Sequence, residues 1–199
     1  MKQMTFKEYR RVDLMMLTIL VIVFEAIATY ASGKWFWVQA INISVTLLLV
    51  CISMMRWSGF AAIHAVVGGF VYCFAAGATK EQYVIYCIGN LFSLSALLLI
   101  KIFGKEKIRN SILKLASFAI VAYLGMAVGR CLMSLFFGGD IRAFIVYVTT
   151  DIISLLFAVI VLIFLRKSDG MIEDQKSYLF RLERERQEEG AYEENDVIL

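Results

Sequence analysis

Long apolar runs without proline constrain this chain more than any other feature. A membrane-spanning helix needs about 20 mostly apolar residues, with a range of about 17–25. The chain is 60% hydrophobic, and a soluble domain rarely exposes apolar patches larger than a few hundred Å². We therefore expect an all-α membrane protein, a compact bundle of six transmembrane helices. The expected helices cover residues 12–31, 40–55, 59–78, 82–102, 112–137 and 141–165.

Basic residues gather on alternate loops between these runs, which predicts the orientation of the chain. Twelve basic residues fall on one side, at Lys2, Lys7, Arg10, Arg11, Arg56, Lys101, Lys105, Lys107, Arg109, Lys114, Arg166 and Lys167. The other side has only Lys34, Lys80 and Arg142. Because cytoplasmic loops carry the excess of Lys and Arg, we expect both termini in the cytoplasm of a multi-pass protein of the cell membrane. The chain then divides into a cytoplasmic segment 1–11, a transmembrane domain 12–165 and a charged cytoplasmic tail 166–199.

Four polar residues interrupt the apolar runs in the half expected to face outward: Glu25, Asn90, Arg130 and Asp151. A charged side chain at the centre of a bilayer costs about 2.5–3.5 kcal/mol on insertion scales, and such residues usually face the bundle interior. The single positive charge of Arg130 does not cancel the two negative charges that Glu25 and Asp151 could carry. Either one carboxyl group is protonated, or a ligand cation, a proton or an ion supplies the missing charge.

Tyrosines share helix faces with these polar residues. Residues 83, 86, 90 and 93 are spaced for one helical face, as are 147, 150, 151 and 154. A mostly apolar lining with a few placed polar groups is typical of a small-molecule pocket. The candidate substrate-binding residues are Glu25, Tyr86, Asn90, Arg130, Tyr147 and Asp151. A structural ion-pair network and a proton path are the alternatives. The aromatic loop GKWFWVQ fits either the membrane interface or a stacking surface over the site.

Small residues at four-residue spacing mark two of the runs. They are Ala61, Ala65 and Gly69, with Gly68 beside them, and Gly125 with Gly129. Such spacing lets helices approach closely in lipid, either inside the bundle or against another membrane subunit. His64 has no partner at metal-ligand spacing, and the four cysteines form no C-x-x-C pair. We expect no bound metal or cofactor.

The sequence argues against an enzyme. It contains a single histidine and no H-E-x-x-H, G-x-S-x-G or P-loop motif. A formal net charge of +3 is too small to indicate nucleic-acid binding. Polar stripes on several helices instead favour a membrane subunit that binds a small solute.

The stretch CISMMRWSGFAAIHAVVGGFVYCFAAGA joins two apolar runs through a tight basic turn with glycine, and LRKSDG follows the last run. This pattern, with six runs in a short chain, resembles the substrate-binding S components of energy-coupling factor vitamin importers. The resemblance implies a pocket that opens outward and binds a vitamin-like solute. It also implies a membrane coupling subunit and two ATPase subunits as partners in the lipid bilayer. The alternative function is a non-catalytic scaffold subunit of a cell-envelope assembly.

Overall fold

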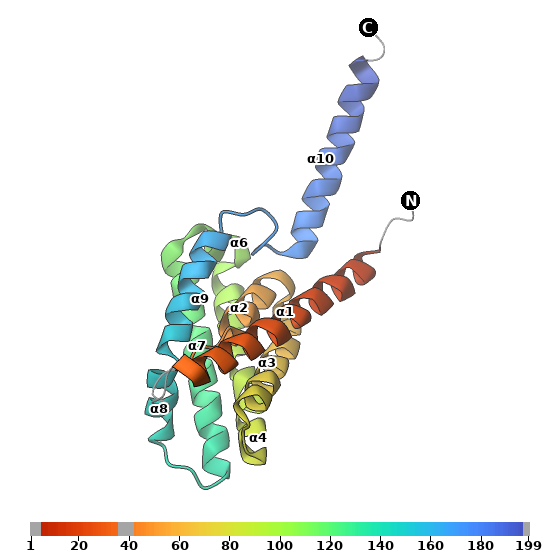
Figure 1. Ribbon diagram of the computed structural model, residues 1–199. Coiled ribbons are helices and arrows are strands. Elements are labelled where there is room, and N and C mark those ends of the chain that lie inside the picture. Colours follow the sequence, from red (N-terminus) through yellow and green to blue (C-terminus); the bar gives the residue numbers. More distant parts are fainter. Residues whose placement is uncertain (1–4, 36–41, 197–199) are drawn as a thin grey trace.

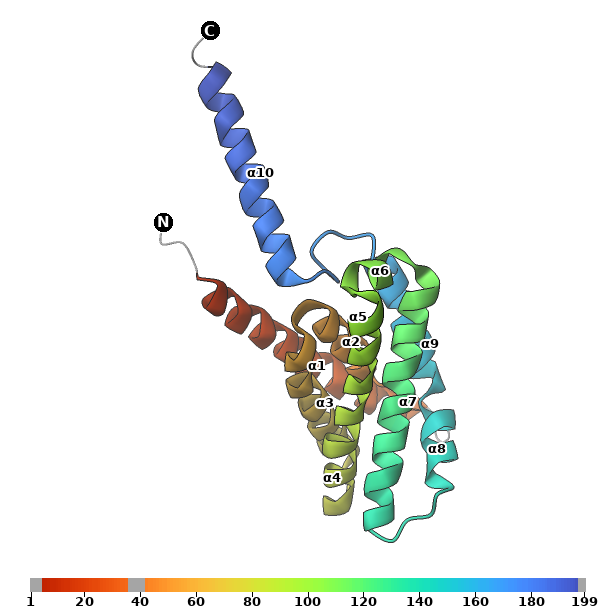
Figure 2. The ribbon, with the colours of Figure 1, turned by 180° about the vertical axis from the view of Figure 1, so that it is seen from behind.

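The computed structural model describes residues 5–35 and 42–196, and all regular structure in these ranges is helical. One end of the bundle, the α6 end, carries the first turns of α1 and the start of α10; at the other, the α8 end, α4 begins and α7 turns into α8 (Figures 1 and 2). The elements are α1 (Phe6–Trp35), α2 (Thr46–Trp57), the 3-10 helix η1 (Ser58–Phe60), α3 (Ala61–Ala76), α4 (Lys80–Gly89), the 3-10 helix η2 (Asn90–Ala96), α5 (Leu97–Phe103), α6 (Lys105–Asn110), α7 (Ile112–Phe136), α8 (Ala143–Thr150), α9 (Ile152–Leu165) and α10 (Gln175–Asp196).

Helix length and hydropathy make this a multi-pass membrane protein. Among the described residues, four helical runs are long and apolar enough to cross a bilayer: Phe6–Lys34, Thr46–Ala76, Lys80–Phe103 and Ile112–Phe136. A fifth is added if α8 and α9, which are bent by 44°, count as one span. These runs also expose many large apolar side chains, such as Phe74 at 73%, as lipid contact requires. The all-α membrane class expected from the sequence is confirmed.

The run Thr46–Ala76 folds back on itself. Ser58 ends α2 with a φ of 55°, and Gly68 of α3 lies directly against the side chain of Thr46 at the start of α2. The two helices are therefore antiparallel neighbours, joined by η1 at the α6 end (Figure 2). At 1.5 Å per residue, α2 and α3 are only about 18 and 24 Å long, less than the roughly 30 Å of a hydrocarbon core.

The short helix α2 is the innermost element of the bundle. All of its residues are buried, and α1, α3, α7 and α9 pack against it. Met54 and Met55 have no exposed surface. A helix that is apolar on all sides belongs in the interior of a protein, so the remaining helices form a layer between α2 and lipid.

Glycines allow the helices to approach closely. A Cβ added at Gly129 of α7 would lie 2.7 Å from Cβ of Phe92 in η2, and one at Gly69 of α3 would lie 2.8 Å from the backbone of Tyr86 in α4. Gly125 also faces the backbone of Phe92. Of the two roles that the small-residue spacing left open, the structure uses these glycines for packing inside the bundle.

The chain after α9 does not leave the bundle at once. Residues 169–174, here called the strap, lie against the α6 end, and Ile172 in the strap is fully buried. Arg56 donates hydrogen bonds to the carbonyl oxygens of Gly170, at 2.6 Å, and Met171, at 3.1 Å. Gln175, at the start of α10, is also fully buried. Only beyond the strap does α10 extend away from the other helices (Figure 1).

Candidate functional site

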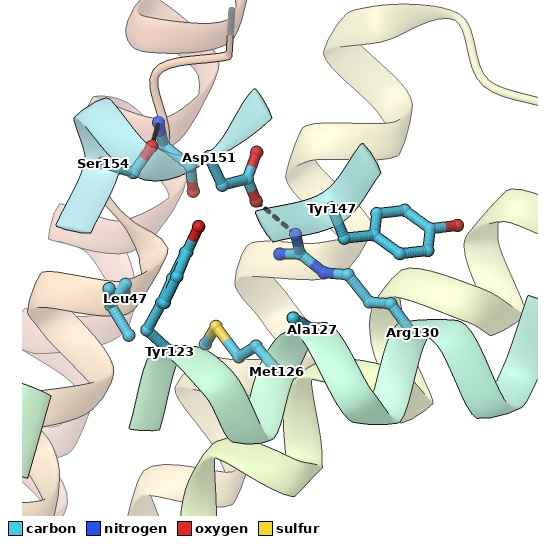
Figure 3. A pocket seen from close by; sticks show the side chains of 9 residues that line it. Leu47, Tyr123, Met126, Ala127, Arg130, Tyr147, Asp151 and Ser154 are labelled. Atoms are coloured by element: carbon cyan, nitrogen blue, oxygen red, sulfur yellow. Dashed lines mark hydrogen bonds and ion pairs between the residues drawn. The ribbon is translucent and has the colours of Figure 1, made fainter. Parts of the chain in front are cut away.

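Arg130 lies inside the bundle on α7, near the α8 end, and contacts groups from three other elements. Its side chain is 5% exposed. Nη1 donates to Oδ2 of Asp151, and Nε donates to Oδ1 of Asn90 at 2.8 Å. The guanidinium carbon lies 4.5 Å from the centre of the Tyr86 ring. Figure 3 shows the ion pair with Asp151. A buried ion pair offsets its desolvation only with such additional hydrogen bonds.

Both hydrogen-bonding partners of Arg130 lie where a helix is interrupted. Asp151 separates α8 from α9, and Asn90 is the first residue of η2. The hydroxyls of Thr149 and Thr150 each donate to a carbonyl four residues earlier, both at 2.8 Å, just before the bend. Such back-bonding bends helices. Short 3-10 segments and discontinuous transmembrane helices often occur at functional sites.

Tyrosine rings lie on two sides of this ion pair. The ring of Tyr86 lies 4.6 Å from that of Tyr72 and 6.1 Å, edge-on, from that of Tyr147. On the other side of the pair, the hydroxyl of Tyr123 donates to the carbonyl of Val148 in α8. Together the rings give the buried charges a mostly apolar wall with hydroxyl groups at its edge.

The second carboxylate oxygen of Asp151 ties the bend to the chain that leads into α2. The side-chain nitrogen Nδ2 of Asn42 donates to Oδ1 of Asp151 at 3.1 Å, and the backbone N–H of Asn42 donates to the carbonyl of Thr150 at 2.9 Å. The hydroxyl of Ser154 donates to the Asn42 carbonyl at 3.1 Å and accepts from the Ser44 amide at 2.8 Å. Residues 42–44 are thereby fixed to α8 and α9.

Glu25 does not contact Arg130. Its side chain is fully buried, and Oε2 accepts hydrogen bonds from the Ser44 hydroxyl at 3.0 Å and from the amides of Val45 and Thr46, both at 2.8 Å. Glu25 therefore caps α2, whose own N-cap residue offers no side-chain hydrogen bond. A helix N-terminus carries about half a positive charge. This partial charge favours the second carboxylate that the sequence left without a counter-ion, although its other oxygen, Oε1, is buried without a hydrogen-bond partner.

A small cavity adjoins the ion pair. Its volume is about 10 Å³, and its lining includes Ser44, Arg130, Tyr147, Asp151 and Ser154 (Figure 3). One water molecule needs at least about 10–15 Å³ by this measure, whereas small-molecule pockets usually enclose about 300–1,000 Å³. In this conformation Asp151 and Asn90, rather than a ligand, accept from Nη1 and Nε of Arg130.

The structure thus brings five of the six candidate residues into one contiguous group and places the sixth at its edge. Asn90, Arg130 and Asp151 are hydrogen-bonded, and Tyr86 and Tyr147 flank them. Glu25 reaches the group only through Ser44, Ser154 and Asn42. Of the aromatic loop, Phe36 and Trp37 lie outside the described residues. His64 lies 3.3 Å from the Thr18 hydroxyl and from the Leu14 carbonyl.

Sequence reasoning missed two parts of this architecture. Asn42 gave no signal, because it lies in a short connection whose partner is more than a hundred residues away. Asp13 did give one, as a carboxylate at the start of an apolar run, but its partner was not evident. Asp13 accepts from Nε of Arg56 at 3.0 Å and from Nε1 of Trp57. This second ion pair lies at the α6 end of α2.

Comparisons with protein families, curated proteins and solved structures find no match for this chain.

Proposed function

We propose that this chain is the substrate-specific membrane subunit of an importer of the energy-coupling factor type. The observation that carries the proposal is the position of Arg130, a buried cation whose two hydrogen-bond partners each lie at a helix break. Transporters build their binding sites from discontinuous helices near the membrane interior. The sequence resemblance to S components supports the same function.

The proposed topology has six crossings, with both termini in the cytoplasm. The hairpin at Ser58 supports this count, because it divides the run Thr46–Ala76 into two antiparallel helices. The crossings are then α1, α2, α3, α4 with η2 and α5, α7, and α8 with α9. The α6 end would face the cytoplasm of the cell, in agreement with its basic residues.

The site would bind a small vitamin-like solute from the outer side. Arg130 would hold an anionic or carbonyl group, and Tyr86 and Tyr147 would stack on a ring. Binding requires a second conformation, because the present cavity of about 10 Å³ is too small for such a solute. The bend at Asp151 is the proposed hinge, since movement of α8 would separate Asp151 from Arg130. The chain has no P-loop, so separate ATPase subunits and a membrane coupling subunit would drive transport.

The test is the small molecule that co-purifies with the protein. Wild-type protein and the Arg130→Ala variant are extracted in mild detergent, and bound metabolites are identified by mass spectrometry. The proposal expects one solute enriched with the wild type and absent from the variant, while the variant, although less stable, still inserts and purifies. Arg142→Ala, at an arginine whose side chain is 87% exposed, is the matched control and should retain the solute.

A structural role in a membrane assembly is the second candidate, and the closed site favours it. Nε and Nη1 of Arg130 and both carboxylate oxygens of Asp151 have partners within the chain, as a structural network requires. If Arg130→Ala protein fails to fold and wild-type protein carries no solute, this second function replaces the first. If the variant folds and binds the solute as well as wild type, Arg130 is not the binding residue.

A further inference from the structure

A second cavity lies at the α6 end, far from Arg130. It encloses about 520 Å³ between α6 on one side and the strap with the first turns of α10 on the other. This is within the usual range for small-molecule sites. Three basic side chains line it, those of Lys105, Arg109 and Arg181, together with three acidic ones, those of Glu106, Glu173 and Asp174. The Ser177 hydroxyl lies on the same wall.

Two of these basic groups converge on a single anion. Glu173 in the strap accepts from Nη1 of Arg109 at 2.7 Å through one oxygen and from Nη1 of Arg181 at 3.1 Å through the other. Lys105 pairs with the neighbouring Asp174. Guanidinium groups recognise phosphate with the same forked geometry that they use for carboxylates. Glu173 thus occupies the position that a phosphate group would take between the two arginines.

The cavity lies where the lipid-facing surface ends. Ile102, just before α6, is 70% exposed, and Leu113, just after it, is 77% exposed. Between and beside them the chain carries Lys101, Lys105, Lys107, Arg109 and Lys114 against the single acid Glu106. Basic clusters directly at the cytoplasmic end of a membrane helix attract anionic lipids.

We propose that this cavity binds the phosphate of an anionic lipid headgroup, whose acyl chains lie along Ile102 and Leu113. The bound phosphate competes with Glu173 for Arg109 and Arg181. Glu173 gives up its contacts with both arginines in this exchange, and the phosphate restores the charge-assisted hydrogen bonds of their guanidinium groups. The inference is independent of the solute site, because it involves none of the residues around Arg130.

The experiment measures binding of defined lipids to purified, delipidated protein. Thermal unfolding is followed in a neutral detergent with added phosphatidylglycerol, phosphatidylcholine or inorganic phosphate at matched ionic strength. Phosphatidylglycerol should raise the midpoint and phosphatidylcholine should not. A shift produced equally by inorganic phosphate also supports the site but assigns it to a free phosphate group. Equal shifts with both lipids, or no shift with any probe, overturn the proposal.

Two variants with opposite expected effects on phosphatidylglycerol affinity distinguish lipid binding from a purely structural role of these ion pairs. The double variant Lys105→Gln/Arg109→Gln should bind phosphatidylglycerol about 25-fold more weakly, since each basic residue near an anionic surface contributes about fivefold. Glu173→Gln removes the internal competitor and should bind it more tightly than wild type. Arg142→Gln, on an exposed side chain at the α8 end, is the control and should not differ. If Glu173→Gln weakens binding, the ion pairs are structural only and the proposal is wrong.

Discussion

Asp13 and Glu25, about three turns apart on α1, hold the two ends of the buried helix α2. Glu25 accepts the first amides of α2, at 2.8 Å from the Thr46 nitrogen, and Asp13 accepts from Arg56 in its last turn at 3.0 Å. Each carboxylate meets the charge that its end of the helix provides, the positive N-terminus in one case and a basic side chain in the other. One helix thereby fixes the axial position and the direction of its neighbour.

The cap formed by Glu25 predicts a large loss of stability when it is removed. Glu25→Ala removes the acceptor of the Ser44 hydroxyl and of the Val45 and Thr46 amides, of which only the Thr46 amide keeps another, the Ser44 hydroxyl at 3.3 Å. A buried donor left without an acceptor costs about 1–3 kcal/mol. Glu25→Gln keeps an acceptor oxygen and should cost less. Thermal unfolding in detergent measures both, with Asp140→Ala, at a side chain that is 64% exposed, as control. Equal stability of Glu25→Ala and the control would contradict the cap.

The ion pair of Arg130 and Asp151 should show strong coupling. Removing one partner of a buried pair typically costs about 3–5 kcal/mol, because the other charge stays buried and unpaired. Arg130→Met and Asp151→Leu should therefore each destabilise the protein strongly, and the double variant should cost clearly less than the sum. A double-mutant cycle of unfolding free energies measures the difference. Additive effects would show that the two side chains do not interact in the folded protein.

The close approach of α7 to α4 and η2 should not tolerate a methyl group. Gly129→Ala places Cβ within 2.7 Å of Cβ of Phe92, and overpacking of this kind costs about 1–3 kcal/mol. Gly59→Ala, where no atom lies within 4 Å of the added Cβ, should change the unfolding free energy by less than about 0.5 kcal/mol. Unfolding midpoints that fall equally in the two variants would contradict this packing.

The strap should detach when its buried residue becomes charged. Ile172→Asp puts a carboxylate where the side chain has no exposed surface, whereas Met171→Asp changes a neighbour that is 46% exposed. We expect rapid tryptic cleavage after Lys176 and Arg181 in the first variant and wild-type rates in the second, because protease sites require local unfolding. Slow cleavage of the Ile172→Asp protein would mean that Ile172 does not hold the strap.

Acid should weaken a second contact of the strap, the ion pair of Asp174 with Lys105. Burial alone would raise the pKa of Asp174, but the hydrogen bond and charge of Lys105, together with hydrogen bonds from the Ser177 amide and hydroxyl, outweigh it and hold the pKa below its usual value. Since the folded pKa is depressed, this contact stabilises the strap above the unfolded pKa of about 3.9 and is lost as pH falls through the lower folded value. Protection from hydrogen exchange at the start of α10, taken relative to the intrinsic exchange rate at each pH, should therefore fall below about pH 4 in wild type. Asp174→Asn protein should lack this pH-dependent loss of protection.

Local sequence pattern was sufficient to predict an all-α membrane protein and the helix faces on which polar residues lie. It did not predict that residues 42–45 precede α2, or that the expected helices 82–102 and 141–165 are interrupted at Asn90 and Asp151. Apolar runs and helical periodicity depend on neighbours within a few turns, so Asn90, Arg130 and Asp151 could be assigned to one region before any fold was known. The six crossings remain a prediction, since two of them fall in one folded-back run. The strap was predicted to be part of a separate charged tail, because nothing near it in the chain reveals that Arg56, more than a hundred residues earlier, donates to the carbonyls of Gly170 and Met171.

What the sequence determined alone is that buried charges must meet partners inside an apolar bundle, because hydrocarbon cannot solvate them. Which partners they meet was decided by the tertiary structure. Glu25 and Asp151 are equivalent in sequence terms, each a carboxylate within an apolar run. The bend after α8 turns Asp151 toward Arg130, and the packing of α1 on α2 brings Glu25 to a helix N-terminus. These partners are 19–21 residues apart in the chain, so the pairings depend on helix rotation and packing, which no local pattern contains.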